Sequence, residues 1–272
     1  MDPSTLIKSP YLTALLNENS AKQSWTSIND VKCFYRKLWP QESCYSVRLI
    51  RVGSDNDGGY LMPANFDDLN WCFSPGSAGR ADFENDLHRL LGIKSFICDD
   101  WSEEPENNGS VAGFTNRLID YGPRSSKTMT MREWISLSLP ITPARGSLIL
   151  QMDIEGGEYP FLLHEEPQTF EFFKYIIVEL HYLHMLHKQK SYEAINAGLD
   201  KLLKTHKPVH IHPNDHTIYG SIDGHPVAHC IEVTFELALP EAQYVPIKTD
   251  SLPHALDQPN IKANKLVAFP KF

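Results

Sequence analysis

The chain has 272 residues, of which 42% are hydrophobic and 22% are charged, a composition typical of a folded globular protein. Lys and Arg total 25 against 34 Asp and Glu, and the formal net charge of −9 disfavours a general nucleic-acid binder, because neutralising phosphates requires a basic surface. Apolar runs are too short for a membrane span, and the N-terminus lacks the basic segment of a secretion signal. The five cysteines show no C-x-x-C spacing, which is typical of reduced thiols, so we expect a cytoplasmic protein.

The first fifty residues predict a helical cap ahead of the main domain. Apolar residues recur at helical spacing over residues 6–16 and again over residues 31–38. We therefore expect an N-terminal helical extension over residues 1–50 and one α/β domain over residues 51–272.

From residue 69 onward, short apolar strands alternate with helical stretches, the order typical of a mostly parallel sheet with crossover helices. Strands are expected over residues 69–74, 95–98, 146–152, 175–180, 208–212 and 229–237, and helices over residues 81–91, 130–139, 161–173 and 192–205. The last strand alternates polar and apolar residues, and that period of two indicates an exposed or antiparallel strand.

A glycine-containing turn, Gly76-Ser77-Ala78-Gly79, follows the first of these strands and precedes a helix. Glycines let a ligand approach the backbone and a helix start presents free N–H groups, so the turn is either a ligand cradle or a flexible loop. Asp99 ends the next strand, where a carboxylate can accept hydrogen bonds from both hydroxyls of a ribose, and Asp100 takes that role if the strand is one residue longer. The turn lacks the full G-x-G-x-x-G pattern, which disfavours a dinucleotide.

Acidic residues follow the strand at residues 146–152. Asp153 and Glu155 stand where this buried strand leaves the sheet. Open α/β sheets bind ligands at the carboxyl ends of their strands, so we expect these acids to face the same crevice as Gly76 and Asp99. Either acid could instead cap the helix that follows.

Twelve histidines are present, and six of them fall within residues 206–229. His210 and His212 lie two positions apart on one predicted strand and therefore share a face. His181 follows another predicted strand. We interpret His181 and His212 as functional candidates and most of the other histidines as surface or hydrogen-bonded loop residues.

Two polar segments lie outside these strand ends. Arg51 and Tyr60 bracket Asp57-Gly58-Gly59, which is a strong turn signal; the two side chains could close over a ligand or bind an anionic sugar, or the segment could be only a structural turn. Asn214 and Asp215 lie in the loop after the strand at residues 208–212.

Together, these segments resemble the FkbM family of S-adenosylmethionine-dependent methyltransferases. The matching blocks are Cys72-Phe73-Ser74-Pro75-Gly76-Ser77-Ala78-Gly79, Phe83-Glu84-Asn85-Asp86-Leu87, Asp99, Met152-Asp153-Ile154-Glu155-Gly156-Gly157-Glu158 and Ile177-Val178-Glu179-Leu180-His181. Three further segments resemble elements found in a subset of that family: Asp57-Gly58-Gly59-Tyr60, His210-Ile211-His212-Pro213-Asn214-Asp215 and Glu232-Val233-Thr234-Phe235. The resemblance covers about residues 51–237, and Pro75 departs from the glycine or valine that is commoner at its position.

The resemblance implies a Rossmann-like class I methyltransferase fold, in which a mostly parallel seven-stranded sheet has an antiparallel last strand. It also implies O-methylation, commonly of a sugar hydroxyl in a glycan or natural product. The cofactor contacts that it implies are Gly76, Ser77, Gly79, Asp99 or Asp100, and Asp153. Asp99 would hold the ribose, and Asp153 would line the reacting centre.

Methyl transfer from a sulfonium is an in-line displacement, so the acceptor hydroxyl must be held near the methyl carbon and must lose its proton. Asp153, His181 and His212 are the candidates to accept that proton, and we favour this role. The same side chains could instead bind a divalent metal ion that lowers the pKa of the hydroxyl.

The candidate substrate contacts are Arg51, Tyr60, Glu155, Asn214 and Asp215. We therefore expect an S-adenosylmethionine-dependent enzyme that acts on a sugar or glycan hydroxyl. The alternatives are a metal-assisted methyltransferase of a small natural product and a non-catalytic cofactor-binding scaffold of the same fold.

Overall fold

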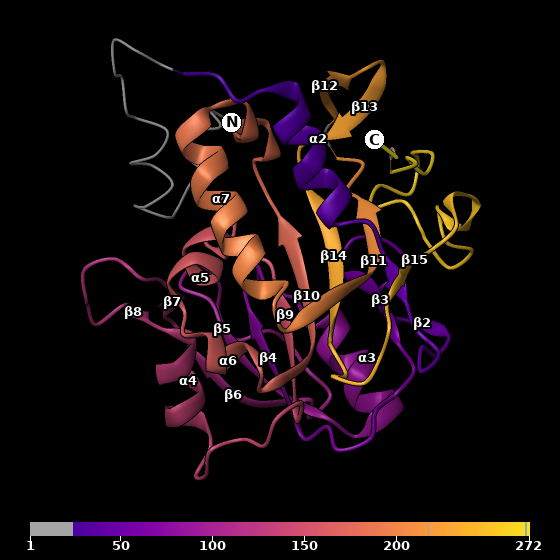
Figure 1. Cartoon of the computed structure of the whole chain (residues 1–272). Coiled ribbons are helices and arrows are strands. Elements are labelled where there is room, and N and C mark those ends of the chain that lie inside the picture. The colour runs from indigo at the N-terminus through magenta and orange to yellow at the C-terminus, as the bar shows by residue number, and fades with distance from the viewer. Residues whose placement is uncertain (1–23, 217, 270) are drawn as a thin grey trace.

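A seven-stranded sheet runs through the centre of the computed structural model, which describes residues 24–216, 218–269 and 271–272 (Figure 1). The strand order is β11-β14-β10-β9-β4-β5-β6. The bounds are β4 Trp71–Pro75, β5 Lys94–Cys98, β6 Val111–Thr115, β9 Leu148–Met152, β10 Phe173–Leu180, β11 His206–Pro213 and β14 Ile231–Leu237. Strands β6, β5, β4, β9 and β10 pair in parallel, which confirms the predicted α/β class and the mostly parallel sheet.

Strand β14 is the last of the seven in chain order, and it lies antiparallel to both of its neighbours, β10 and β11. The alternation of polar and apolar residues therefore predicted its direction correctly. Exposure is not the cause of that alternation, because β14 is almost wholly buried, including its polar residues Glu232 and Thr234. The two faces of this strand differ in polarity and not in access to solvent.

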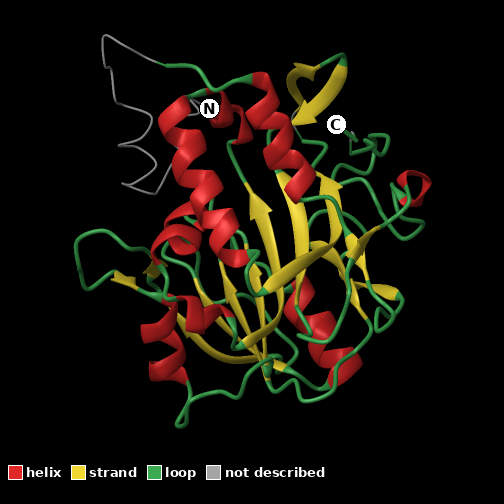
Figure 2. Cartoon of the chain, in the orientation of Figure 1, coloured by secondary structure: helices red, strands yellow, loops and turns green. Residues whose placement is uncertain are grey.

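Helices cover one face of the sheet, and Figures 1 and 2 show them to one side of it. They are α2 Ile28–Lys37, α4 Met131–Ser138, α5 Glu158–His164, α6 Pro167–Phe170 and α7 Gln189–Leu202. Their apolar side chains join those of Leu150, Ile176 and Val178 in the larger of two hydrophobic cores. The single helix expected over residues 161–173 is instead α5, α6 and the start of β10, because the residue before Pro167 is forced into an extended conformation.

A β-hairpin and one helix cover the other face. The hairpin consists of β2 Leu49–Gly53 and β3 Gly59–Pro63, and the helix is α3 Asp82–Leu91. They enclose a smaller core that includes Tyr60, Phe83 and Ile177. Sequence patterns predicted α3 and the turn at Asp57-Gly58-Gly59, but not the two strands that the turn joins.

The predicted N-terminal cap is not shown by the described residues. The first of its two helices lies outside them, and the second is α2, which buries Phe34 and Tyr35 in the larger core. The expected boundary at residue 50 falls inside β2.

Short elements complete the fold. They are β1 Gln41–Glu42, β7 Leu118–Ile119, β8 Thr128–Met129, η2 Leu183–His187, β12 Ile218–Ile222, β13 His225–Ala228, β15 Val245–Pro246 and η3 Thr249–Ser251. Within the described part of the chain, every helix is too short or too polar to cross a membrane.

Candidate functional site

The carboxyl ends of the parallel strands bring the predicted acids and the glycine turn together. The amide of Asp153, the first residue after β9, donates to the Pro75 carbonyl at the end of β4 (3.1 Å). A side chain on residue 76 would place its Cβ 1.7 Å from the Asp153 carbonyl oxygen, and Gly76 has a φ of 83°. Only glycine fits this contact, so the turn and Asp153 form one unit.

Asp99 is bonded to the same turn. One carboxylate oxygen accepts from the amides of Ser77 (3.0 Å) and Ala78 (2.8 Å), and the other accepts from the amide of Trp101 (2.8 Å). Burial alone would raise the pKa of Asp99, but these backbone hydrogen bonds outweigh it and leave that pKa below its ordinary value. Asp99 is therefore ionised and fixed in position, and its remaining lone pairs can still accept hydrogen bonds.

A cavity of about 340 Å³ lies between the turn and the ends of β5 and β9. Gly76, Asp99, Asp153 and Glu155 line it on the polar side. The rest of its lining includes Trp101, Leu118, Ile119 and Ile154. Such a volume is at the lower end of the range for small-molecule sites, which are mostly apolar with a few fixed polar groups. Asp100 does not line this cavity.

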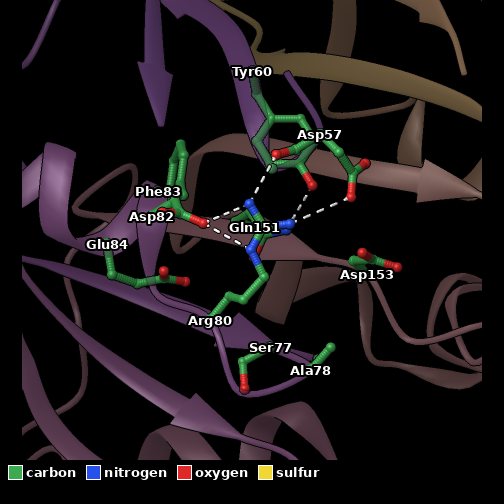
Figure 3. Close-up of a pocket in the computed structure, with 12 residues that line it drawn as sticks. Asp57, Tyr60, Ser77, Ala78, Arg80, Asp82, Phe83, Glu84, Gln151 and Asp153 are labelled. Carbon is green, nitrogen blue, oxygen red and sulfur yellow. Dashed lines mark hydrogen bonds and ion pairs between the residues drawn. The ribbon is translucent and has the colours of Figure 1, made fainter. Parts of the chain in front are cut away.

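A second, smaller hollow of about 90 Å³ lies on the other side of the turn, toward the hairpin (Figure 3). Gly76, Ala78 and Asp153 line both hollows. Figure 3 shows the guanidinium of Arg80 between Asp57 and Asp82, with which it pairs at 3.7 and 2.7 Å. The two hollows thus share a wall at the point where β4 and β9 end.

His181 comes close to Asp153, as the sequence predicted. Its Nε2 lies 3.6 Å from Asp153 Oδ1, and its Nδ1 lies 3.0 Å from an oxygen of the buried Glu158. Burial alone would lower the pKa of His181, but Cys230 and Glu158 outweigh it and hold that pKa well above its ordinary value. Burial and the neighbouring Glu179 raise the pKa of Asp153 well above its ordinary value.

Behind Asp153, a row of buried polar side chains crosses the sheet. The strand register places Glu179 of β10 beside Asp153, Glu232 of β14 opposite Glu179, and His212 of β11 opposite Glu232. Residues in register on neighbouring strands point to the same face, here the face under the hairpin. Burial raises the pKa of both Glu179 and Glu232 to about 8.

Hydrogen bonds connect this row to the hairpin. Tyr60 donates to Glu179 (3.0 Å) and accepts from the side-chain amide of Gln151 (3.2 Å). Ser74 lies between the Gln151 oxygen (2.5 Å) and the buried Glu84, and a hydroxyl has one proton to donate. The Glu84 carboxyl therefore carries the second proton. Burial raises the pKa of Glu84, which agrees with a protonated carboxyl.

The structure separates His212 from Asp153 and His181. Three strand spacings of roughly 4.8 Å place it about 14 Å from Asp153. Its Nε2 pairs with Asn260 (3.2 Å), and its Nδ1 lies 3.8 Å from Asp257, both from the C-terminal segment. Burial lowers the pKa of His212, so the ring is neutral and serves to hold that segment on the sheet.

The predicted substrate contacts are also dispersed. Arg51 donates to the carbonyls of Ser54 (2.8 Å) and Asn56 (2.7 Å), which braces the hairpin loop. Asn214 accepts from the amide of His216, and Asp215 from the amide of Ile261. Tyr60 lines the smaller hollow, and only Glu155 lines the larger cavity.

Sequence reasoning missed five residues of this region as functional or structural partners: Glu158, Glu179, Glu232, Asp257 and Asn260. Glu179 carried a signal, since it is a charged residue within an apolar strand and such residues are rarely buried without a partner. Glu232 carried a weaker one, since its strand alternates polar and apolar residues. Asp257 and Asn260 carried none, because they lie in an irregular segment far away in the sequence.

Comparison with protein-family models, curated proteins and solved structures found no match to this chain.

Proposed function

We propose that this protein is an S-adenosylmethionine-dependent O-methyltransferase that acts on a hydroxyl of a sugar or glycan. One observation carries the proposal: the Gly76 turn, Asp99 and Asp153 come from the ends of three adjacent parallel strands and line one cavity of about 340 Å³. This is the crevice in which open α/β sheets bind nucleotide ligands. The resemblance of the same residues to the FkbM family supplies the reaction.

The cofactor would lie with its ribose at Asp99 and its sulfonium near Asp153. The ionised Asp99 has lone pairs left for ribose hydroxyls, and the apolar side chains of Leu118 and Ile119 suit the adenine. A cationic sulfonium is favoured by the acids at the end of β9. The antiparallel β14 also supports the proposal, since the resemblance implies a seven-stranded sheet with such a strand.

The acceptor hydroxyl would approach Asp153 from the open side of the cavity. His181, held by Glu158, is the side chain best placed to accept its proton. Because the pKa of His181 is raised, the ring is neutral and able to act as a base only at pH values above its ordinary pKa. His212 is too far away to take part, so of the three residues first considered we retain Asp153 and His181. The five cysteines are all unpaired, which fits the cytoplasm as the proposed location.

Cofactor binding can be measured by isothermal titration with S-adenosylhomocysteine, with NAD⁺ as the competing ligand class. We expect the chain to bind S-adenosylhomocysteine and not NAD⁺. Asp99→Asn should weaken it at least about tenfold, because one lost charge-assisted hydrogen bond is worth about 1.5–3 kcal/mol. Asp100→Asn is the matched control and should bind normally, since Asp100 lines neither hollow. Absence of binding to the wild-type chain would remove the cofactor from the proposal.

Turnover is tested by the mass gain of one methyl group on candidate oligosaccharides. His181→Gln should keep S-adenosylhomocysteine binding and lose most of the turnover, whereas His212→Gln should lose much less if it folds normally. Equal loss in both variants would contradict the assignment of His181 to the reacting centre. A chain that binds the cofactor but methylates no acceptor would favour the scaffold alternative.

A further inference from the structure

The imidazole of His181 lies among carboxylates that its Nε2 does not hydrogen-bond. Nε2 is 3.6 Å from Asp153 Oδ1 and 3.9 Å from Glu155 Oε2, and both distances exceed those of a hydrogen bond. The other ring nitrogen, Nδ1, faces Glu158 Oε1 at 3.0 Å. Because a carboxylate only accepts, Nδ1 donates to Glu158, so the proton that the ring gives up when it binds a metal ion is the one on Nε2. Nε2 faces Asp153 and Glu155 and also lies 3.7 Å from the buried Glu179.

From this geometry we propose that Asp153, Glu155 and His181 bind a divalent transition-metal ion. One oxygen of each acid and one ring nitrogen lie within 4.8 Å of one another. Ligands that share an ion at about 2.1 Å lie roughly 3–3.5 Å apart. The distances from Nε2 to the two acids, 3.6 and 3.9 Å, are slightly longer, so the site closes when the two carboxylates move toward the ring. One imidazole and two carboxylates suit Mn²⁺, Fe²⁺ or Zn²⁺ better than Mg²⁺ or Ca²⁺.

The partner of His181 also fits a metal site. Histidines that bind metals almost always donate their second ring N–H to a carboxylate or carbonyl, which fixes the ring. Glu158 fills that place: it is wholly buried and also accepts from the amide of Ile154 (3.1 Å). The histidine is therefore held by the protein interior, while the two acids lie at the cavity.

The two acids are partly exposed to the cavity, which leaves room for a further ligand of the ion. The side chains of Asp153 and Glu155 are 36% and 42% exposed, and both line the cavity of about 340 Å³. His181 closes the opposite side with 10% exposure. A hydroxyl entering from the cavity could coordinate the ion, which would lower the pKa of that hydroxyl. This role rests on the proposed methyl transfer, but the metal site itself does not.

Two other groups of potential ligands lie nearby in the described part of the chain, and both are less suitable. In Glu179, His181 and Cys230, the thiol donates to Glu179 at 3.4 Å and all three residues are buried. In Asp57, Glu179 and Glu232, the buried oxygens already accept hydrogen bonds from Tyr60 and Asn260. Neither group offers an open position at the cavity.

The experiment uses the full chain after removal of metals with a chelator. Binding of Mn²⁺ is followed by electron paramagnetic resonance, and binding of Zn²⁺ by calorimetry, with no cofactor present. We expect one ion per chain. Glu155→Gln should weaken binding by about tenfold or more, and Glu158→Gln by about 10–100-fold, which is the usual effect of removing the carboxylate behind a metal-bound histidine.

Cys230→Ser tests the competing group and should not weaken binding of the ion, because it removes no ligand of the proposed site. The inference is overturned if the wild-type chain binds neither ion, or if binding survives Glu155→Gln and is lost in Cys230→Ser. S-adenosylhomocysteine titrated in the presence of chelator separates the two proposals. Cofactor binding without metal binding removes only the metal site, and metal binding without cofactor binding removes only the methyltransferase.

Discussion

The two faces of the central sheet are built from the same strands but differ in chemistry. In β9 and β10, Leu150, Ile176 and Val178 point toward the helices and belong to the larger hydrophobic core, whereas Gln151 and Glu179 point toward the hairpin. Alternate residues of a strand point to opposite faces, so a single strand can serve both environments. The helix-covered face stabilises the fold, and the hairpin-covered face supplies buried polar groups next to the crevice.

This difference explains why the site lies where it does. Polar groups are costly to bury unless they are hydrogen-bonded. Tyr60 of the hairpin provides a partner for Glu179, and Asn260 of the C-terminal segment provides one for Glu232. The row of side chains beginning at Asp153 is thus held beside the cavity. Leu150, Ile176 and Val178 on the helical face belong to a hydrophobic core instead, so we expect substitutions on the two faces to have different consequences.

The largest stability effect is expected on the helical face. Phe161 of α5 is fully buried and packs edge-to-face against Phe170 at 5.2 Å. Phe161→Ala should lower the free energy of unfolding by about 3–5 kcal/mol, because it leaves a cavity in the larger core. Urea unfolding measures this loss, and S-adenosylhomocysteine binding by the folded fraction should be unchanged. A loss below about 1 kcal/mol would show that this face does not dominate stability.

The hairpin face should make stability depend on pH. Glu232 has a pKa of about 8 in the folded chain, well above that of an unfolded glutamate, so the folded state retains its proton at neutral pH. The protonated Glu232 contributes fully to the free energy of unfolding below about pH 4.5, and this contribution is lost as the pH rises to 8. Over that range the free energy of unfolding falls with a slope approaching about 1.4 kcal/mol per pH unit. Glu232→Gln imitates the protonated form and should reduce that slope. Unfolding measured in urea between pH 5 and pH 8 tests it, and equal slopes would contradict a buried, protonated Glu232.

A smaller effect is expected for the hydroxyl that joins the hairpin to the sheet. Tyr60→Phe removes the donor to Glu179 and the acceptor of Gln151, so it should cost about 1–3 kcal/mol without leaving a cavity. Tyr175→Phe is the matched control, since Tyr175, near the start of β10, is also buried but its hydroxyl donates to the backbone carbonyl of Asn65 (2.7 Å). Comparable losses in the two variants would show that the network at Tyr60 has no special weight.

The fold was largely predictable from hydrophobic periodicity. The strands β4, β9 and β10 lie close to their expected positions because strands buried on both faces have mostly continuous apolar runs. Strands β5 and β11 also lie close to their expected positions, although polar residues interrupt them. The hairpin β2–β3 was missed, since Arg51 interrupts the apolar run of β2, Gly59 and Pro63 bound that of β3, and only the turn has a distinct composition. Strand β6 was missed as well, because Val111–Thr115 contains small and polar residues at the edge of the sheet.

The candidate site was predictable in part. Gly76, Asp99, Asp153, Glu155 and His181 meet at one crevice because each follows, or lies close to, the end of a parallel strand, and such ends share one edge of the sheet. His212 also lies near the end of its strand, β11, which runs in the same direction as β10, yet it lies three strands away from Asp153. Position along a strand is readable in a sequence, but position across the sheet depends on strand order.

The sequence by itself therefore determined the α/β class, the positions of most strands and the acids at their ends, because these depend on local periodicity. Only the tertiary structure decided the partners of those residues. The insertion of β14 between β10 and β11 pairs Glu232 with Glu179 and moves His212 away from the crevice. The C-terminal segment brings Asp257 and Asn260 into contact with His210 and His212 of β11, about 50 residues earlier in the sequence. Long-range pairing of this kind leaves no local pattern in the chain, because its residues meet only after the sheet has formed.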